Sequence, residues 1–434
     1  MRRSPSWHCL AACFAGGLAL WSCSPKPGPG TVDAVAGASA GRGEDRAGAG
    51  GSSVDLGGTA GNQAGGGQSA AGAGLTSSPG GGGSAAGASE VGGVPGGGFG
   101  GSVDGGAAGS ADALTDFDGR CGQGWAAPGS VSLPNLNGSV TPQVDSAGNW
   151  SFTFGRYRFV VAGARGARVI EFSIDGNNLL DPSTGSTFWP SPQQAWTWPI
   201  AEEIDSAAYV AHADGTSVSL TSSIAQSVGL SVHKRFWVNR ASGVVSIEYQ
   251  LVNEAQLSAA WAPWELTRVR AGGYTFAPKG PGGRTITEDS GQNPLPMSLL
   301  PPPPAAGGIE WLNYPSLSLT LDNYLTEFDG AEGWLAHANK FGKSLLPVLF
   351  VKSFVDAPDA SLPTNQAEIQ LWTSGTANPK LLEVEEQGAE QVLLPGASLS
   401  WTVHWSACEL PSSLVLSAGS AELAGLARAH AIKP

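Results

Sequence analysis

The sequence predicts an all-β fold, and three observations support this prediction. From residue 150 onward, apolar residues alternate with polar ones at a period of two, the pattern of half-buried strands. The clearest runs are 150–154, 170–174, 245–251 and 399–405. Turn-forming pairs such as Asp175-Gly176 and Asp214-Gly215 separate the runs. No segment before residue 412 has a convincing helical period, so we expect one large, mostly antiparallel β-sandwich.

The composition divides the chain into four parts. Residues 1–22 hold two arginines followed by an apolar run, which is the pattern of a signal peptide. Residues 23–116 are dominated by Gly, Ala and Ser, and they cannot bury enough apolar surface to offset the entropy of ordering them. We therefore expect a disordered tether there. The β domain is expected at 117–411, and 412–434 is a tail able to form one short helix.

The signal-like segment ends in a motif for lipid attachment. Its last residues, Leu20-Trp21-Ser22-Cys23, resemble the lipobox of bacterial lipoproteins, in which the cysteine is lipidated after cleavage. The alternatives are an ordinary secretory signal with a chance cysteine, or a short anchor that is never cleaved. We expect an exported protein whose membrane contact is a lipid on Cys23. Because Ser24 is not the aspartate that retains some lipoproteins at the inner membrane, we expect it at the outer membrane.

Cysteine usage indicates one disulfide. Of the five cysteines, Cys9 and Cys13 leave with the signal segment, and Cys23 is the candidate for lipidation. Cys121 and Cys408 remain, one near each end of the β domain, and such an isolated pair in an exported protein is most simply a disulfide. Neither has a second cysteine or a histidine at the spacing of zinc ligands, so we expect no metal there.

The chain is acidic, and its charge limits its partners. The formal net charge is −13 at pH 7, and it becomes two units more negative if Arg2 and Arg3 leave with the signal segment. Such a protein lacks the excess of basic residues that binds nucleic acid or anionic lipid surfaces. We therefore expect a neutral ligand, no nucleic-acid partner and no cofactor.

Two tryptophan-rich stretches contain the candidate site. They read WAPWELTR at 261–268 and FWPSPQQAWTWP at 188–199. The C–H face of a sugar ring packs on an indole, and its hydroxyls need charged or amide partners, so these stretches favour a carbohydrate site. The alternative is that the tryptophans fill the core of a large β protein, because Trp is usually highly buried.

Several stretches together resemble a known family. In chain order they are ARVIEFSIDGNNLLDP, GSTFWPSPQQAWTWP, KRFWVNRASGVVSIEYQLVN, WAPWELTRVRAGG, LFVKSFVDAPDA and LLPGASLSWTVHW. They resemble a bacterial family of unassigned function within the galactose-mutarotase-like (aldose 1-epimerase-like) superfamily. The resemblance implies a β-supersandwich of two large antiparallel sheets whose concave face takes a carbohydrate. The superfamily includes epimerases, sugar-binding modules and domains of polysaccharide-processing enzymes, so the fold alone assigns no activity.

The resemblance also locates the residues of mutarotase chemistry. Mutarotases use a carboxylate base and a histidine acid to open the sugar ring. The family glutamate corresponds to Lys352 here, and the stretch WAPWE stands where the family histidine is expected. Both departures count against ordinary mutarotase activity. If the protein is an epimerase or a polysaccharide-processing enzyme, its candidate catalytic residues are Glu265, Lys352 and His337.

Three classes of function stay open. The first is a cell-envelope lipoprotein that binds carbohydrate without turnover in a concave groove. The expected ligand contacts are Trp189, Gln193, Trp196, Trp264, Glu265, Arg268 and Lys352. The second is a sugar-modifying enzyme that uses the same groove. The third is a structural envelope protein, in which the tryptophans are core and Glu265 with Lys352 forms only a structural bridge, because a buried charge needs a partner.

Replacing Cys23 tests the lipid anchor. We expect the Cys23→Ser chain to lose incorporation of a fatty-acid probe completely, because serine has no thiol to accept the lipid. Gel fluorescence after metabolic labelling measures this. Cys13→Ser is the matched control and is expected to keep the label. Equal labelling of Cys23→Ser and the unchanged chain would contradict the assignment.

Overall fold

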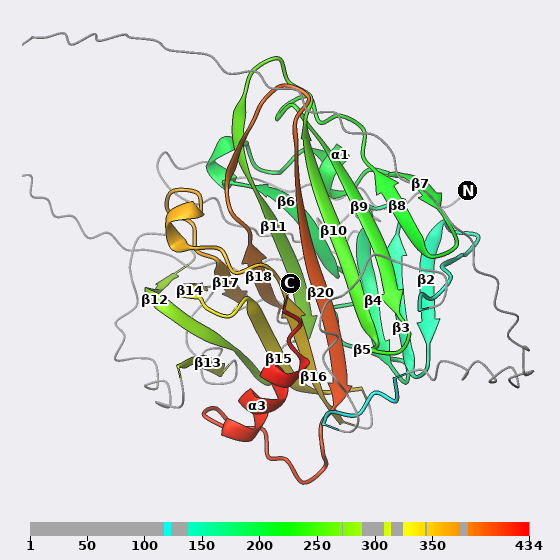
Figure 1. Cartoon of the computed structure of the whole chain (residues 1–434), viewed down its shortest axis with the longest axis vertical. Helices are drawn as coiled ribbons and strands as arrows, with labels where there is room; N and C mark the ends of the chain where they lie inside the picture. The colour runs from blue at the N-terminus through cyan, green and yellow to red at the C-terminus, as the bar shows by residue number, and fades with distance from the viewer. Residues whose placement is uncertain are drawn as a thin grey trace, which may run out of the picture. The chain divides into compact units, whose positions relative to one another are not determined.

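The strands of this chain form two antiparallel arrays that pack face to face, as a computed structural model shows (Figure 1). The structure describes residues 117–122, 138–270, 272–288, 308–313, 324–342, 345–373 and 381–433. All of these belong to one compact unit. The expected signal segment, Cys23 and the expected tether lie outside the described residues.

The first array contains most of the long strands from the middle and the end of the chain. In spatial order it consists of β7 (Val210–Ala213), β8 (Ser217–Thr221), β9 (Leu230–Asn239), β10 (Val244–Asn253), β20 (Ser398–Glu409), β16 (Leu346–Ser353), β15 (Trp334–Phe341), the first residues of β12 (Tyr274–Glu288) and β13 (Ile309–Asn313). Every pairing in it is antiparallel. Figure 1 shows β9, β10 and β20 side by side in front of β3 and β4.

The second array combines early strands with late ones. Its order is β1 (Gln143–Val144), β2 (Asn149–Phe154), β3 (Tyr157–Ala162), β4 (Arg168–Ile174), β6 (Ser186–Ser191), β11 (Ala259–Arg270), β18 (Leu381–Gln387), β17 (Ile369–Thr373), β14 (Tyr324–Gly330) and the later part of β12. Two short strands pair at its margins, β5 (Asn177–Asn178) with β4 and β19 (Gln391–Leu393) with β11. Because β12 pairs in both arrays, it joins them. The predicted all-β sandwich is confirmed.

Aromatic side chains fill the space between the arrays. Phe159 and Phe172 of the second array contact Trp405 of the first array, with ring centroids 5.9 and 6.0 Å apart. Phe188 of β6 stacks on Tyr249 of β10 at 4.3 Å. Full burial of one such side chain stabilises the fold by about 1.5–3 kcal/mol. The alternating apolar residues that predicted the strands therefore meet in one core.

The predicted turns and the predicted tail helix are present. Asp175 and Gly176 link β4 to β5 with φ angles of 48° and 75°, the left-handed conformation that a tight type I′ hairpin requires. Helix α3 spans Ala421–His430, and the hydroxyl of Ser420 accepts a hydrogen bond at its first turn. The remaining helices of the described residues are single turns, α1 (Glu202–Asp205), η1 (Gln193–Ala195) and η3 (Asp359–Ser361). In the described part of the chain, no helix has the length and apolar character to cross a bilayer.

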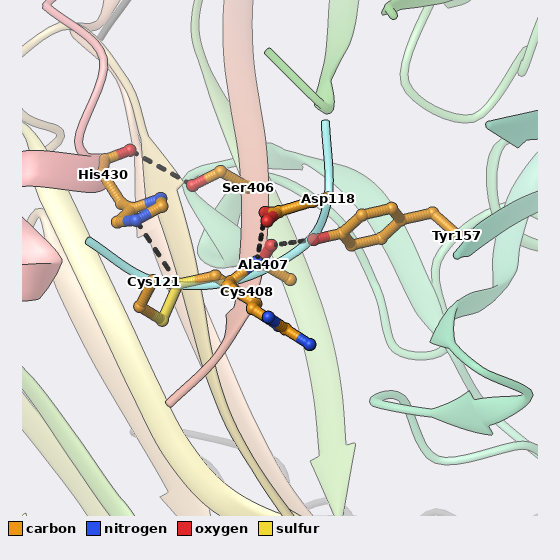
Figure 2. Close-up of a disulfide and its surroundings, with 8 residues drawn as sticks. Asp118, Cys121, Tyr157, Ser406, Ala407, Cys408 and His430 are labelled. Atoms are coloured by element: carbon orange, nitrogen blue, oxygen red, sulfur yellow. Dashed lines mark hydrogen bonds between the residues drawn. A yellow bond between two sulfur atoms is a disulfide. The ribbon is translucent and has the colours of Figure 1, made fainter. Parts of the chain in front are cut away.

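The expected disulfide is also present. Cys121 and Cys408 are bonded across a sequence separation of 287 residues (Figure 2). The crosslink ties the first described segment of the chain to the end of β20. Chain-entropy theory allows on the order of 5 kcal/mol for a loop of this size, as an upper figure.

Candidate functional site

Strand β11 lies in the middle of the second array and determines where the expected site residues point. The stretch 261–268 forms the body of β11. Side chains therefore alternate between its two faces. Glu265 lies 3.5 Å from Lys352 of the first array, whereas Trp264 packs against Trp189 of β6 and bonds Glu385 of β18. We call the side of the second array that carries Trp264 and Trp189 the outer face.

Glu265 and Lys352 belong to an ion cluster buried between the arrays. The Nζ atom of Lys352 lies 2.6 Å from a carboxylate oxygen of Glu386 and 3.5 Å from one of Glu265, and it donates to the Thr267 hydroxyl at 2.7 Å. Ser186 donates to Glu265 as well. The side chains of Lys352, Glu265 and Glu386 are 0–1 % exposed. Lys352 thus meets carboxylates of its own chain, as a buried cation must.

Burial raises the pKa of Glu386 well above its ordinary value. Lys352 opposes this rise, and the nearby carboxylate of Glu265 adds to it. Glu386 therefore binds a proton more readily than an exposed glutamate does, and Lys352 lies between it and the carboxylate of Glu265. This arrangement lowers the cost of enclosing three ionisable groups in an apolar core.

The outer face carries aromatic and polar side chains in rows that cross the strands. Cross-strand partners share a face, so the ladder register defines these rows. One row is Trp372, Glu383 and Arg268; the next is Gln370, Glu385, Leu266 and Thr187; the third is Gln387, Trp264 and Trp189. Polar residues thus recur on this face of β17, β18 and β6, where most of them are buried and Glu383 and Trp372 are half-buried.

Four tryptophans cluster at one side of the outer face. The ring centroid of Trp189 lies 5.5 Å from Trp264, 5.5 Å from Trp198 and 5.9 Å from Trp196. Trp189 and Trp264 are buried, while Trp196 and Trp198 are only half-buried. The indole of Trp196 also donates to the carbonyl of Pro190 at 2.9 Å, which orients the ring. The half-buried rings present an oriented indole surface to solvent.

Charged groups beside the tryptophans are held in pairs. The Arg268 guanidinium lies 2.5 Å from Glu383, and Arg168 lies 2.8 Å from Asp205. Asp205 also accepts from the indole of Trp189 at 2.8 Å. Burial raises the pKa of Asp205, but Arg168 and this indole outweigh it, so the pKa is lowered. Glu383 and Asp205 keep 12 and 20 % of their side chains exposed, so both carboxylates reach solvent.

Glu385 carries the carboxyl group of this face whose pKa is raised. Burial raises its pKa well above the ordinary value, and the adjacent carboxylate of Glu383, which is hydrogen-bonded to it, adds to the rise. The indole of Trp264 donates to Glu385 at 2.9 Å and only partly opposes this. The outer face therefore contains a carboxyl group of raised pKa beside a carboxylate that Arg268 binds, a pairing that can give and take protons.

The structure separates the residues expected to line one groove. Trp189, Trp264 and Arg268 lie together on the outer face, and Gln193 and Trp196 lie in the segment that follows β6. Glu265 and Lys352 do not join them, because strand alternation turns both toward the core. The structure therefore brings residues of the stretches 188–199 and 261–268 together on one face and places Lys352 elsewhere.

His337 lies apart from this constellation. It is buried in β15, with Nδ1 2.9 Å from the Thr275 hydroxyl, and burial lowers its pKa to about 3. It is therefore neutral at physiological pH. Its ring also packs edge-on against Phe341, and both Thr275 and Phe341 belong to the first array. These contacts are those of a structural histidine.

Sequence reasoning missed the residues of β18. Glu383, Glu385 and Gln387 alternate with Leu382 and Val384, a period-two pattern that places the polar residues on one face. That pattern was the available signal. Asp205 offered no comparable signal, because it sits in the single turn of α1 and reaches Trp189 only through the tertiary fold.

Comparisons with known proteins give fold similarities at low identity. A galactose mutarotase-like protein from Lactobacillus casei matches with a TM-score of 0.42 and 13 % identity, over 59 % of this chain and 99 % of that one. A galactose mutarotase-like protein from Clostridium acetobutylicum matches with a TM-score of 0.41 and 10 % identity, over 63 and 100 %. A galactose mutarotase related enzyme from Lactobacillus acidophilus matches with a TM-score of 0.41 and 9 % identity, over 62 % of this chain and 100 % of that one. No family model and no curated protein matches the sequence.

Removing the charge of Lys352 tests whether the ion cluster is structural. We expect Lys352→Met to lower the free energy of unfolding by about 3–5 kcal/mol, because it leaves a buried carboxylate without its cation. Denaturant unfolding measures this. The variant that also carries Glu265→Gln and Glu386→Gln removes the uncompensated charge and is expected to recover most of the stability. A Lys352→Met protein as stable as the unchanged chain would contradict this role.

Proposed function

We propose that this protein binds carbohydrate on its outer face. The observation that carries the proposal is the arrangement there of half-buried indoles, Trp196 and Trp198, beside the partly exposed carboxylates Glu383 and Asp205. Indole faces pack on the C–H face of a sugar, and carboxylates accept hydrogen bonds from its hydroxyls. Both carboxylates are already fixed by arginines, so little side-chain entropy is lost when a ligand binds.

The balance of charge on the outer face favours a neutral glycan. Glu383 and Asp205 are paired with Arg268 and Arg168, and the pKa of Glu385 is raised by burial. An anionic sugar would have to displace a carboxylate from its arginine. Neutral hydroxyls can instead donate hydrogen bonds to the paired carboxylates without breaking the ion pairs. The half-buried Trp372 lies in the same row as Glu383 and Arg268 and extends the aromatic surface along β17. The proposed ligand is therefore a neutral oligosaccharide or polysaccharide segment.

We place this binding protein at the cell envelope, exported and attached by a lipid on Cys23 to the outer membrane. The motif around Cys23 and the Gly/Ala/Ser-rich residues that follow it support this part of the proposal. Ordinary mutarotase activity is not proposed. Lys352 stands at the position of the expected base and points into the ion cluster between the arrays.

A glycan array tests the binding proposal. We expect the Cys23→Ser chain to bind a defined set of neutral glycans, and Trp196→Ala to weaken the best of these about tenfold or more, which is about 1.4 kcal/mol of lost stacking. Trp150→Ala is the matched control, because Trp150 is also half-buried but lies on β2. The melting temperature of each variant separates lost binding from lost folding. Equal binding by Trp196→Ala, or no binding to any glycan, would favour a purely structural protein.

A second candidate function is proton transfer on a bound sugar. The observation that favours it is the carboxyl pair of Glu383 and Glu385, in which Arg268 binds one member and burial raises the pKa of the other. Such a pair supplies a base and an acid on the same face. General acid–base groups of this kind contribute roughly 10²–10⁴-fold in rate. An epimerase or a polysaccharide-processing enzyme would use them in this way.

Substitutions at two adjacent glutamates of β18, Glu385 and Glu386, distinguish this function from simple binding. If bound glycan is turned over, Glu385→Gln is expected to lower the rate by roughly 10²–10⁴-fold. It keeps a hydrogen-bond acceptor for Trp264 but has no acidic proton. Glu386→Gln is the matched control, because it changes the next residue on the opposite face. Anomer exchange or glycan cleavage followed by NMR measures the rate. Equal rates in the two variants would exclude Glu385 as the acid.

A further inference from the structure

Three separate segments bring soft metal donors together beside the disulfide. Cys121 belongs to the first described segment, Cys408 lies near the end of β20, and His430 is the last residue of α3 (Figure 2). The Nε2 atom of His430 lies 3.5 Å from Sγ of Cys408. The ligand atoms of all three residues lie within 4.8 Å of one another, and no other such group occurs among the described residues. All three side chains are buried.

We propose that Cys121, Cys408 and His430 form a binding site for copper(I) when the disulfide is open. Thiolate and imidazole are the donors that select soft metal ions. Three donors in a buried place suit a three-coordinate ion, whereas structural zinc sites take four protein ligands. Residue spacing did not indicate this site, because His430 is 22 residues from Cys408 and reaches it only when α3 docks on β20.

The sulfur atoms are held near each other by more than their own bond. The amide of Cys121 donates to the carbonyl of Glu409 at 3.0 Å, and the amide of Glu409 donates to the carbonyl of Gly119 at 2.7 Å. These backbone bonds clamp the segment around Cys121 onto β20. These bonds do not involve the sulfur atoms, so we expect them to keep the two thiols within reach of one ion when the disulfide opens.

The histidine is positioned independently of the disulfide too. The hydroxyl of Ser406 donates to the carbonyl of His430 at 3.1 Å, and the amide of Ile432 donates to the Ser353 hydroxyl at 3.0 Å. Figure 2 shows the imidazole directed at the sulfur atoms from α3, with Ser406 beside its backbone. The site therefore has two preorganised sides, one for the sulfurs and one for the imidazole.

The chemistry balances with a dithiol as the reductant. A dithiol gives two electrons and two protons to the disulfide, which yields the thiols of Cys121 and Cys408 and a cyclic disulfide of the reductant. Copper(I) then replaces both thiol protons, which pass to solvent, and accepts a lone pair from His430. The ion replaces the disulfide as a crosslink, because it joins the segments of Cys121 and Cys408. Through His430 it also joins α3 to them.

Copper(I) titration of the reduced protein tests the proposal. The probe protein is the full chain with Cys9→Ser, Cys13→Ser and Cys23→Ser, in which Cys121 and Cys408 are the remaining thiols. It is reduced with a dithiol, desalted without oxygen and titrated with copper(I) against a coloured chelator. We expect two free thiols before the titration, one copper(I) per chain after it, and a thiolate-to-copper absorption band in the ultraviolet.

The histidine contribution is measured with a matched pair of variants. His430→Gln is expected to weaken copper(I) binding by roughly tenfold or more, at least the loss seen when a metal site loses an outer-shell partner. His404→Gln is the control, because His404 is also buried, on the same strand as Cys408, but bonds Ser246 at 2.8 Å. Equal affinities in the two variants overturn the proposal, as does any failure of the reduced chain to bind one ion. Circular dichroism of the reduced, metal-free chain is expected to match the oxidised one, and unfolding on reduction overturns the proposal as well.

Discussion

The register of β11 is the constraint on which the rest of the arrangement depends. A shift of this strand by one residue would exchange all its side chains between the two faces. Glu265 would leave Lys352 and point outward, and Trp264 would enter the core. The ion cluster opposes that shift, because Lys352 would then lose a partner inside an apolar core. We infer that the cluster contributes to specificity of register as well as to stability.

The outer face exists as a consequence of this register. With Glu265 fixed inward, Trp264 must meet Trp189 on one side and Glu385 on the other, and Arg268 must meet Glu383. Each contact then limits the next, because Arg268 fixes the Glu383 carboxylate, which adds to the effect of burial in raising the pKa of Glu385. The ion cluster and the outer face thus use alternate residues of the same strands. The buried ion cluster and the proposed ligand-binding surface are in this way on opposite sides of one array.

Much of the fold could be predicted from the sequence, because it depends on local periodicity. Alternation predicted the strands, Asp175-Gly176 predicted a hairpin, and the two cysteines of the β domain predicted their bond. Less of the candidate site could be predicted. The stretch around Trp264 was interpreted by composition, so its tryptophans and its glutamate were assigned to one surface. The period of two, applied to the same eight residues, places Trp264 and Glu265 on opposite faces.

Contacts between distant segments account for what the sequence could not predict. Lys352 was recognised as a buried cation in need of a carboxylate, but Glu386, its nearer partner at 2.6 Å, lies on a strand that pairs with β11 only in the folded chain. Asp205 and His430 are similar cases, since each sits at a helix whose docking brings it to its partners. Their residue types are common and their spacing is uninformative, so only the tertiary fold identifies them.

The ionisable groups of this structure fall into two sets with opposite dependence on pH. Asp205 has a folded pKa below its ordinary value of 3.8, so its contribution to stability is present above that value and is lost as pH falls through the folded pKa. Glu368 has a folded pKa raised by burial from 4.5 to about 8, so its contribution is present below 4.5 and is lost as pH rises toward 8. The folded pKa values of Glu385 and Glu386 are also raised by burial, so their contributions to stability depend on pH in the same direction as that of Glu368. Falling pH therefore removes the contribution of Asp205, and rising pH removes the contributions of Glu368, Glu385 and Glu386.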